Sequence, residues 1–281
     1  MTNELGFDTK FAAQIGESQV WEGKEILFDP DSSPASWEHY KICYKDTFKD
    51  IYNIQSPQFF SYFKGKYVDI PLEYYNRLYA LNVGAKRKKE KWYSIYQAES
   101  RVSGETDFNF NEYKYGKFLN ILFNELKNNK EEFEKQKAEL DKCSKMHHTL
   151  LNFSLMQTMG GMQQVKSRGL GDRFDRPDTL IYLLDCYYRK DEKNKDKFFS
   201  GRASAANKQA LRDYLDSFTD VYDYCKKIYF IDEDLVKKLI NNGSKPINTV
   251  EDISKYMDLA LEFWKQKEEK LRSLYSKALK K

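Results

Sequence analysis

The sequence predicts an all-α protein built as a single compact multi-helix domain, and three observations lead to this prediction. Apolar residues recur at spacings of three and four over most of the chain after residue 36, as amphipathic helices require. Glycine and proline are concentrated in a few short stretches, so long intervals are free of helix breakers. No internal repeat and no low-complexity linker divides the chain into separate units.

Residues 1–35 are the exception and are expected to form an irregular N-terminal arm. Glycines and prolines interrupt this segment too often for a long helix, at Gly6, Gly16, Gly23, Pro30 and Pro34. The stretch 20–28 has a turn pair between apolar residues and predicts a short β-hairpin or an extended arm packed on the helical body. Residues 36–281 are expected to form the helical domain, with a central loop at 157–178 that is rich in Gly, Arg and Asp.

The first helices of this domain are expected between residues 36 and 84. One starts with Ser36 as its cap, a second begins at Ser56 followed by Pro57, and a third begins at Pro71 and ends at Gly84. The basic run 86–91 precedes Trp92 and other aromatic residues, which invites a nucleic-acid interpretation. On a helix the aromatic residues share one stripe and the cations point elsewhere, so the run is interpreted as a solvated face.

Residues 103–106 are expected to form a loop, after which Asn109 or Asn111 caps a long helical tract that reaches about His147. The second half of this tract, 130–145, is mostly charged and should either project from the body or pack along only a thin line.

The C-terminal part is expected to be helical as well. Apolar residues surround the segment 179–188, which indicates a core helix, and further helices are expected at 205–218, 221–229 and 235–240. Gly243 should end the helix at 235–240 as a C-cap, and Thr249 with Asp252 should cap the last helix as a capping box.

Composition and charge exclude several classes of protein. Lys and Arg number 47 against 43 Asp and Glu, and a net charge of +4 is too small for a nucleic-acid footprint over the whole surface. The cysteines lack zinc or redox spacing and are expected to be buried free thiols: Cys43, Cys143, Cys186 and Cys225. The sequence shows no secretory signal and no apolar stretch of about 20 residues, so a cytoplasmic protein without membrane contact is expected.

The function is expected to lie between Met146 and Tyr188, where histidines, clustered glycines and alternating Asp and Arg occur together. Backbone N–H groups of the four glycines between 160 and 171, beside Lys166, Arg168 and Arg173, suit an anion at the start of the following helix. No Walker pattern is present, and the structural alternative is a packed crossover loop. The candidate ligand-binding set is Asn152, Gly160, Gly161, Lys166, Arg168, Asp172, Arg173, Asp175 and Arg176.

The arginines of this stretch also have two interpretations. Arginine next to glycine is typical of bidentate recognition of phosphate or carboxylate. The structural alternative is that Asp175 caps the next helix, Pro177 starts its first turn, Asp178 favours the positive end of its dipole, and Arg173 and Arg176 hold the loop by ion pairs.

His147 and His148 are the candidate catalytic residues, because histidine is the usual general acid or base near neutral pH. Neighbouring helical residues point about 100° apart, so at most one of the two faces a given site. No histidine or carboxylate lies at metal-ligand spacing from them, so no metal or other cofactor is expected. One His with Arg and Asn could support metal-independent phosphodiester cleavage.

A resemblance supports treating the central stretch as one unit. The segments Asn152–Met156, Gly160–Gln163, Asp172–Asp175 and Asp223–Ile231 resemble the signature segments of uncharacterised proteins from Firmicutes and related bacteria, over about residues 140–245. The resemblance implies a bacterial protein and carries no activity with it.

The leading hypothesis is a cytoplasmic protein that recognises a phosphate-bearing ligand, a nucleotide or a nucleic-acid backbone, at a central polar pocket. Cleavage of that ligand without a metal is left open. The alternative is a non-catalytic interaction or regulatory protein whose partner protein binds the helices at 130–145 and 249–279.

Overall fold

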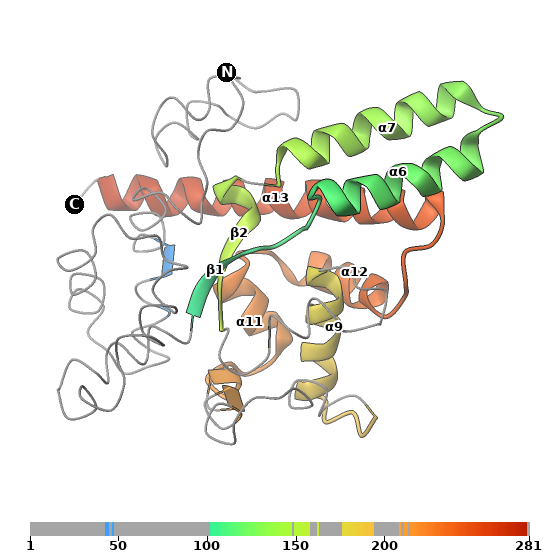
Figure 1. Cartoon of the computed structure of the whole chain (residues 1–281). Helices are drawn as coiled ribbons and strands as arrows, with labels where there is room; N and C mark the ends of the chain where they lie inside the picture. The colour runs from blue at the N-terminus through green and yellow to red at the C-terminus, as the bar shows by residue number, and fades with distance from the viewer. Residues whose placement is uncertain are drawn as a thin grey trace, which may run out of the picture.

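The computed structural model describes residues 43–44, 47, 102–147, 149–157, 162, 176–193, 208, 211–212 and 214–279. This part is mostly helical, as predicted, with a small antiparallel sheet in addition (Figure 1). The expected N-terminal arm, the hairpin at 20–28, the helices starting at residues 56 and 71, and the basic run at 86–91 lie outside the described residues.

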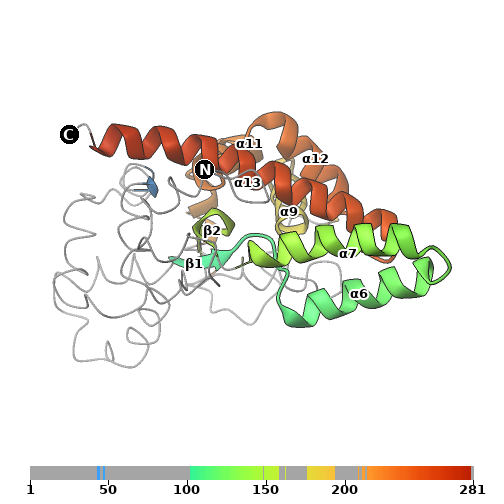
Figure 2. The same cartoon turned by 90° about the horizontal axis from the view of Figure 1, so that it is seen from above.

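Helix α13, Val250–Leu279, is the longest described helix, and several of the other described elements pack against it (Figures 1 and 2). It begins with the predicted capping box. The backbone N–H of Asp252 donates to Thr249 Oγ1 at 3.2 Å, and the backbone N–H of Thr249 donates to the Asp252 carboxylate at 3.1 Å. These reciprocal bonds satisfy two of the N–H groups that a helix start leaves without partners.

Helices α6, Glu112–Leu126, and α7, Lys130–Lys145, form a hairpin beside one end of α13. The prediction of one long tract was wrong, because the Asn129 side chain accepts the N–H of Glu132 at 3.2 Å and starts a new helix. Of the two predicted N-caps, Asn109 and Asn111, it is Asn111 that caps α6. The thin packing line of α7 is confirmed, since its buried residues Gln136, Leu140 and Cys143 follow at spacings of four and three.

Strands β1, Val102–Thr106, and β2, Phe153–Gln157, pair antiparallel, with Thr106 opposite Phe153 and Val102 opposite Gln157. The prediction of a loop at 103–106 was therefore wrong. Ser103 and Gly104 are typical turn residues, but the pairing partner lies far along the chain and cannot be seen in the local pattern. The 3₁₀ helix η3, Leu150–Asn152, leads into β2. Of the predicted loop at 157–178, Gln157 belongs to β2 and residues 177–178 belong to a helix, while 158–161 and 163–175 lie outside the described residues.

Helices α9, Pro177–Tyr188, α11, Val221–Ile228, and α12, Glu233–Gly243, form the second helical layer (Figure 1). Gly243 is not the predicted left-handed C-cap, since Ser244 follows it in right-handed helical geometry. A Cβ on Gly243 would lie 2.0 Å from the carbonyl oxygen of Asp178. Glycine is required here because α12 and α9 approach each other so closely.

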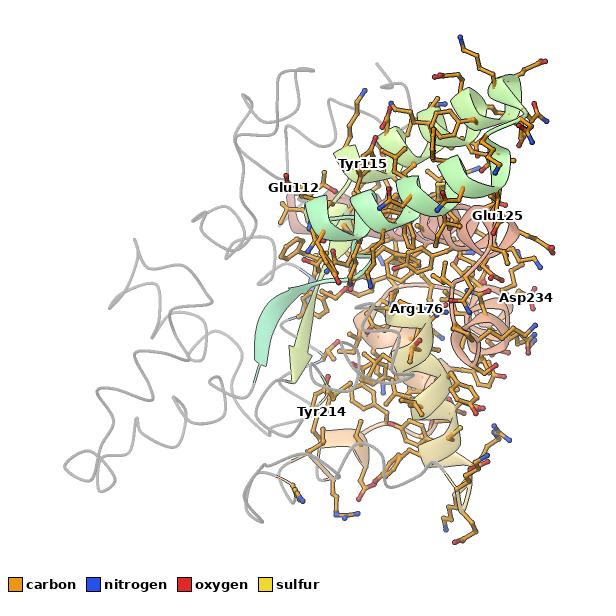
Figure 3. The ribbon with its side chains drawn as sticks, turned by 45° about the vertical axis from the view of Figure 1, so that its right-hand side comes forward. Glu112, Tyr115, Glu125, Arg176, Tyr214 and Asp234 are labelled. Carbon is orange, nitrogen blue, oxygen red and sulfur yellow. The ribbon has the colours of Figure 1, made fainter. Side chains whose placement is uncertain are left out.

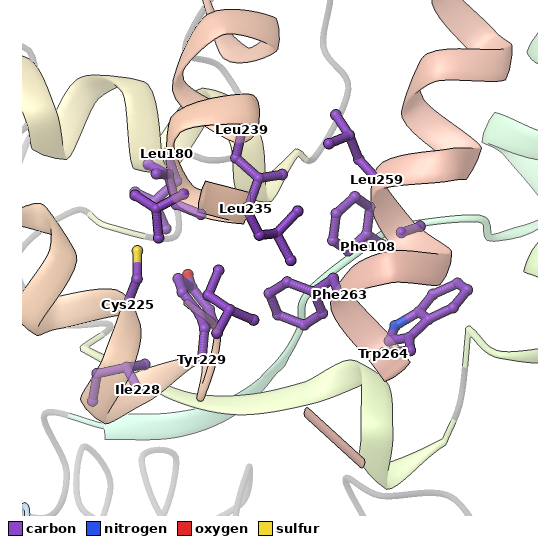
Figure 4. Close-up of a cluster of buried hydrophobic side chains, with 14 of the residues drawn as sticks. Phe108, Leu180, Cys225, Ile228, Tyr229, Leu235, Leu239, Leu259, Phe263 and Trp264 are labelled. Carbon is purple, nitrogen blue, oxygen red and sulfur yellow. The ribbon is translucent and has the colours of Figure 1, made fainter. Parts of the chain in front are cut away.

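The core lies between α13 and this layer and is rich in aromatic rings (Figure 4). Phe108 packs against the rings of Tyr256, Phe263 and Trp264 of α13, with centroids 5.2 to 6.0 Å apart. Tyr229 packs against Phe263 from the other layer at 5.6 Å. All four cysteines are free and buried, as predicted. Among the described helices, none is long and apolar enough to cross a bilayer.

Candidate functional site

Arg176 occupies the N-cap position of α9 and is buried, with 1% of its surface exposed (Figure 3). Its guanidinium makes two bonds to the Asp178 carboxylate, from Nε to Oδ1 at 3.0 Å and from Nη2 to Oδ2 at 2.6 Å. It also donates to the backbone oxygens of Lys245 at 2.6 Å and Asn242 at 3.2 Å. The ion pair that the structural alternative predicted for this arginine is therefore present, and it joins α9 to the end of α12.

The first turn of α9 already holds an anion, which is the Asp178 carboxylate. Asp178 Oδ1 accepts the backbone N–H of Thr179 at 2.9 Å, and Oδ2 accepts Nδ2 of Asn242 at 2.7 Å. Pro177 stands in the first turn, as predicted. The Asp178 carboxylate therefore occupies the anion position at this helix start, and Arg176 is already paired with it. The phosphate site that was expected at the start of this helix is thus taken by a side chain of the protein.

Asn152, at the end of η3, is a fully buried junction between β2, α7 and α13. Its Nδ2 donates to the backbone oxygens of Phe108 at 2.7 Å and His147 at 2.9 Å. Its Oδ1 accepts the Phe108 N–H and the Trp264 indole N–H, both at 2.8 Å. The amide thus uses both donors and both acceptor positions inside the protein, which is the full capacity of this side chain.

His147, in the turn that follows α7, is buried next to the same junction. Its Nδ1 accepts the backbone N–H of Phe110 at 3.4 Å, so the ring helps to hold the segment between β1 and α6. An imidazole that accepts at Nδ1 carries its proton on Nε2. His148 lies outside the described residues, as do Gly160, Gly161, Lys166, Arg168, Asp172, Arg173 and Asp175.

Asn152 and Arg176 contact α13 at two different levels. Asn152 bonds to Trp264, whereas the Arg176 guanidinium lies over the ring of Tyr256 at 5.9 Å from its centroid. Tyr256 and Trp264 are eight residues apart, which corresponds to about 12 Å along a helix. The structure therefore brings His147 and Asn152 together and places Arg176 apart from them, at the other end of the segment 158–175.

A second buried polar group, made of Asp107, Ser154 and Lys267, lies beside the Asn152 junction. Lys267 Nζ donates to Asp107 Oδ2 at 2.7 Å, to Ser154 Oγ at 2.8 Å and to the backbone oxygen of Phe153. Ser154 Oγ in turn donates to Asp107 Oδ2 at 2.9 Å. All three side chains are fully buried. The group ties the start of β2 and the segment after β1 to α13.

The Ser154 and Lys267 pair resembles a nucleophile with its base, but its bonding favours a structural role. An ammonium group has three protons, and the three acceptors named above use all of them. Burial lowers the pKa of Lys267, and the charge of Asp107 opposes that effect. A lysine that already donates three hydrogen bonds has no lone pair with which to take the Ser154 proton.

Sequence reasoning missed this group, although one signal was present. The apolar stripe of α13 runs through Trp264 and Leu271, and the stripe position between them falls at Lys267. A lysine at a core position needs a buried acidic partner, which indicates a buried ion pair without naming Asp107.

In the part of the chain that the structure describes, no group of three or more His, Cys, Asp or Glu side chains could hold a metal ion. Comparison of the chain with known proteins finds no matching family model, no matching curated protein and no matching solved structure.

Proposed function

We propose that the chain recognises a phosphate-bearing ligand, a nucleotide or a nucleic-acid backbone, through the segment between β2 and α9. One observation carries the proposal: both ends of this segment are fixed by buried polar contacts. Ser154, in β2, is held by Lys267 at 2.8 Å, and Arg176, at the start of α9, is held by Asp178 at 2.6 Å. A segment anchored in the core at both ends loses less entropy when it binds a ligand.

The charges in this proposal come from Lys166, Arg168 and Arg173. The sequence between the two anchors also contains Gly160, Gly161, Gly169 and Gly171, whose backbone can approach an anion closely. Arg176 is assigned to the frame, because its donors bond to Asp178 and to two backbone oxygens. Asn152 is assigned to the frame for the same reason.

The test compares ligand affinity and stability for matched arginine variants. Thermal shift and binding are measured with mononucleotides, cyclic nucleotides and short RNA and DNA, for the wild type, Arg168→Lys and Arg173→Lys. Lysine keeps the charge and loses the bidentate donor, so affinity should fall by about tenfold while the fold is retained. Arg189→Lys, at an exposed ion pair outside the segment, is the control and should bind like the wild type. Equal binding by all of these proteins, or no phosphate ligand for the wild type, would remove the proposal.

Cleavage of the ligand belongs to the same proposal and assigns general acid–base chemistry to His147 or His148. His147 has a structural bond at Nδ1, so its substitution should cost stability as well as activity. His148→Gln is therefore the cleaner variant. Loss of turnover at unchanged thermal stability would support a catalytic role, and unchanged turnover in both variants would exclude one.

The alternative function, a non-catalytic interaction protein, is favoured by one observation on the hairpin. Tyr113 and Phe123 of α6 are the large hydrophobic side chains that stand exposed in the described structure, at 62% and 59%. Exposed apolar surface is typical of protein contact sites, and both side chains belong to one helix, although Phe123 also packs against Phe133 of α7 with ring centroids 6.2 Å apart. If this alternative is right, Tyr113→Ala with Phe123→Ala should abolish partner binding and leave phosphate binding unchanged.

A further inference from the structure

Tyr44 lies buried in the body of the protein, against a turn that is far from it in the sequence. It is 0% exposed, and its hydroxyl donates to the backbone oxygen of Ile228 at 2.9 Å, across 184 residues of the chain. That oxygen belongs to the last turn of α11, where a helix leaves its carbonyl groups without partners inside the helix. The Tyr44 ring also packs against the ring of Phe230, with centroids 5.2 Å apart. Tyr44 therefore contacts the turn that joins α11 to α12 at two points.

This turn contains a strained residue. Phe230 has a φ of 61°, in the left-handed region that bulky side chains seldom adopt. Such a conformation persists where the surrounding structure fixes the backbone on both sides. After Phe230, Gln266 of α13 accepts the backbone N–H of Asp232 at 2.9 Å and donates to the Asp232 carboxylate at 3.1 Å. Before Phe230, the backbone is held by the bond from Tyr44 to the Ile228 oxygen.

The other end of α12 contacts the start of α9. The backbone oxygens of Asn242, in α12, and Lys245, just after it, accept hydrogen bonds from Arg176. Gly243 lies so close to Asp178 that a Cβ on it would clash with the Asp178 carbonyl group. Closely packed helices transmit a displacement instead of absorbing it. A shift of α12 at its first turn would therefore also move the anchor that Arg176 forms.

Cys43 lies near the other anchor, the buried group of Asp107, Ser154 and Lys267. Burial raises the pKa of the Cys43 thiol, and the positive charge of Lys267 opposes this effect. Burial lowers the pKa of Lys267, and Cys43 is among the groups that oppose that effect in turn. Two groups influence each other's charge in this way when they lie close together. Residues 43 and 44 thus stand beside both anchors of the segment between β2 and α9.

We propose that Cys43 and Tyr44 form a latch through which the part of the chain before β1 sets the position of both anchors and regulates ligand binding by the segment between them. Tyr44 acts on the α9 anchor through Phe230 and α12. Cys43 acts on the β2 anchor through its place beside Lys267. When the latch opens, the strain at Phe230 is relieved and α12 loosens its hold on α9. The regulation rests on the phosphate function proposed above, whereas the latch itself does not.

The first experiment measures backbone hydrogen exchange of the full chain by mass spectrometry, without ligand. Tyr44→Phe keeps the ring and removes the hydroxyl. It should speed exchange at 229–245 and 176–181 by at least about fivefold, because a buried hydrogen bond is lost, and leave 112–126 unchanged. Tyr188→Phe is the matched control, since its hydroxyl also donates to a backbone oxygen, that of Leu215 at 2.8 Å. The control should leave 229–245 at the wild-type rate. A wild-type rate at 229–245 in Tyr44→Phe would overturn the latch.

The second experiment tests whether Tyr44 restrains the strained turn. Glycine adopts a φ near +60° without strain, so Phe230→Gly removes the conformation that Tyr44 has to hold. In this background, Tyr44→Phe should speed exchange at 229–245 by less than about twofold, because the two residues are coupled. An equal acceleration in both backgrounds would show that Tyr44 and the strain at Phe230 act independently, and it would overturn the mechanism.

The third experiment tests regulation with the mononucleotides, cyclic nucleotides and short RNA and DNA used above. Tyr44→Phe should weaken binding by about threefold or more, because its anchors open more often, and Tyr188→Phe should bind like the wild type. Faster exchange with unchanged affinity would support the latch and overturn the regulation. If the wild type binds no phosphate ligand, the phosphate function and its regulation both fail, and the exchange rates still decide the latch.

Discussion

Arg176→Met is the most direct test of how the end of the central segment is held. Methionine keeps much of the apolar stem but removes every donor of the guanidinium. The Asp178 carboxylate, 0% exposed, would then be buried without its cation, and the backbone oxygens of Asn242 and Lys245 would lose their bonds to the side chain. Removing one partner of a buried pair costs about 3 to 5 kcal/mol. That is a large share of the ~5 to 15 kcal/mol by which a domain is usually stable.

The assay is urea unfolding followed by circular dichroism, with Arg189→Met as the matched control. Arg189 pairs with Asp185 at 2.6 Å, but its side chain is 60% exposed. An exposed pair contributes about 0 to 1 kcal/mol, so the control should hardly move the midpoint. If Arg176→Met costs no more than Arg189→Met, the buried clamp is not what holds α9 to α12. Asp178→Leu added to Arg176→Met should recover part of the loss, because it removes the unpaired buried charge.

Three further predictions concern stability. Leu184→Ala should lower the free energy of unfolding by about 2 to 5 kcal/mol in the same assay, since Leu184 is 0% exposed in α9. An unfolding midpoint close to that of the wild type would contradict the place of Leu184 in the core. Gly243→Ala should be strongly destabilising, because the added Cβ would meet the Asp178 carbonyl oxygen. Gly116→Ala should instead raise the stability by about 1 kcal/mol, since a Cβ there meets nothing and alanine favours the helix. Equal effects of the two substitutions would refute the close approach of α12 to α9. Stability should fall above about pH 9, because burial raises the pKa of cysteines and tyrosines, most strongly for three cysteines above the usual 9.0 and four tyrosines above the usual 10.0. The unfolded chain therefore loses these protons first. The lowered pKa of Lys267 acts in the opposite sense, because its destabilising effect fades as the pH rises toward 10.5, but it is one group against seven. An unfolding midpoint that stays constant or rises between about pH 8 and pH 10.5 would contradict this balance. The seven residues whose pKa is raised most are Cys43, Cys143, Cys225, Tyr188, Tyr214, Tyr224 and Tyr229.

Features with a local cause could be predicted from the sequence. The capping box of Thr249 and Asp252 needs residues only three positions apart, and it is present. The Asn111 cap and the buried helix that follows Arg176 also depend on short spacings. The break between α6 and α7 had a local signal as well, in Asn128 and Asn129, but the helical period on either side of it suggested one tract.

Features that depend on distant partners could not be predicted in the same way. The partner strand of β1 lies about 50 residues away, and Ser103 and Gly104 alone favour a turn. The oxygens that Arg176 binds belong to residues 66 and 69 positions further along the chain. Arginine beside aspartate has the same local composition in a ligand site and in a buried clamp. The pattern therefore indicated that Arg176 makes bidentate bonds and left the acceptor open.

The bonding at the start of α9 also decides where a phosphate could be held. The dipole of a helix start favours an anion by about 0.3 to 1 kcal/mol at an exposed position. A carboxylate at about 4 Å opposes a second anion by about 4 kcal/mol near a protein surface. Asp178 takes up that position, and Arg176 only cancels its charge. The attraction for a phosphate must then come from cations other than Arg176, which is paired with Asp178. Within the candidate set these are Lys166, Arg168 and Arg173, so phosphate affinity should follow their side chains and not the dipole of α9.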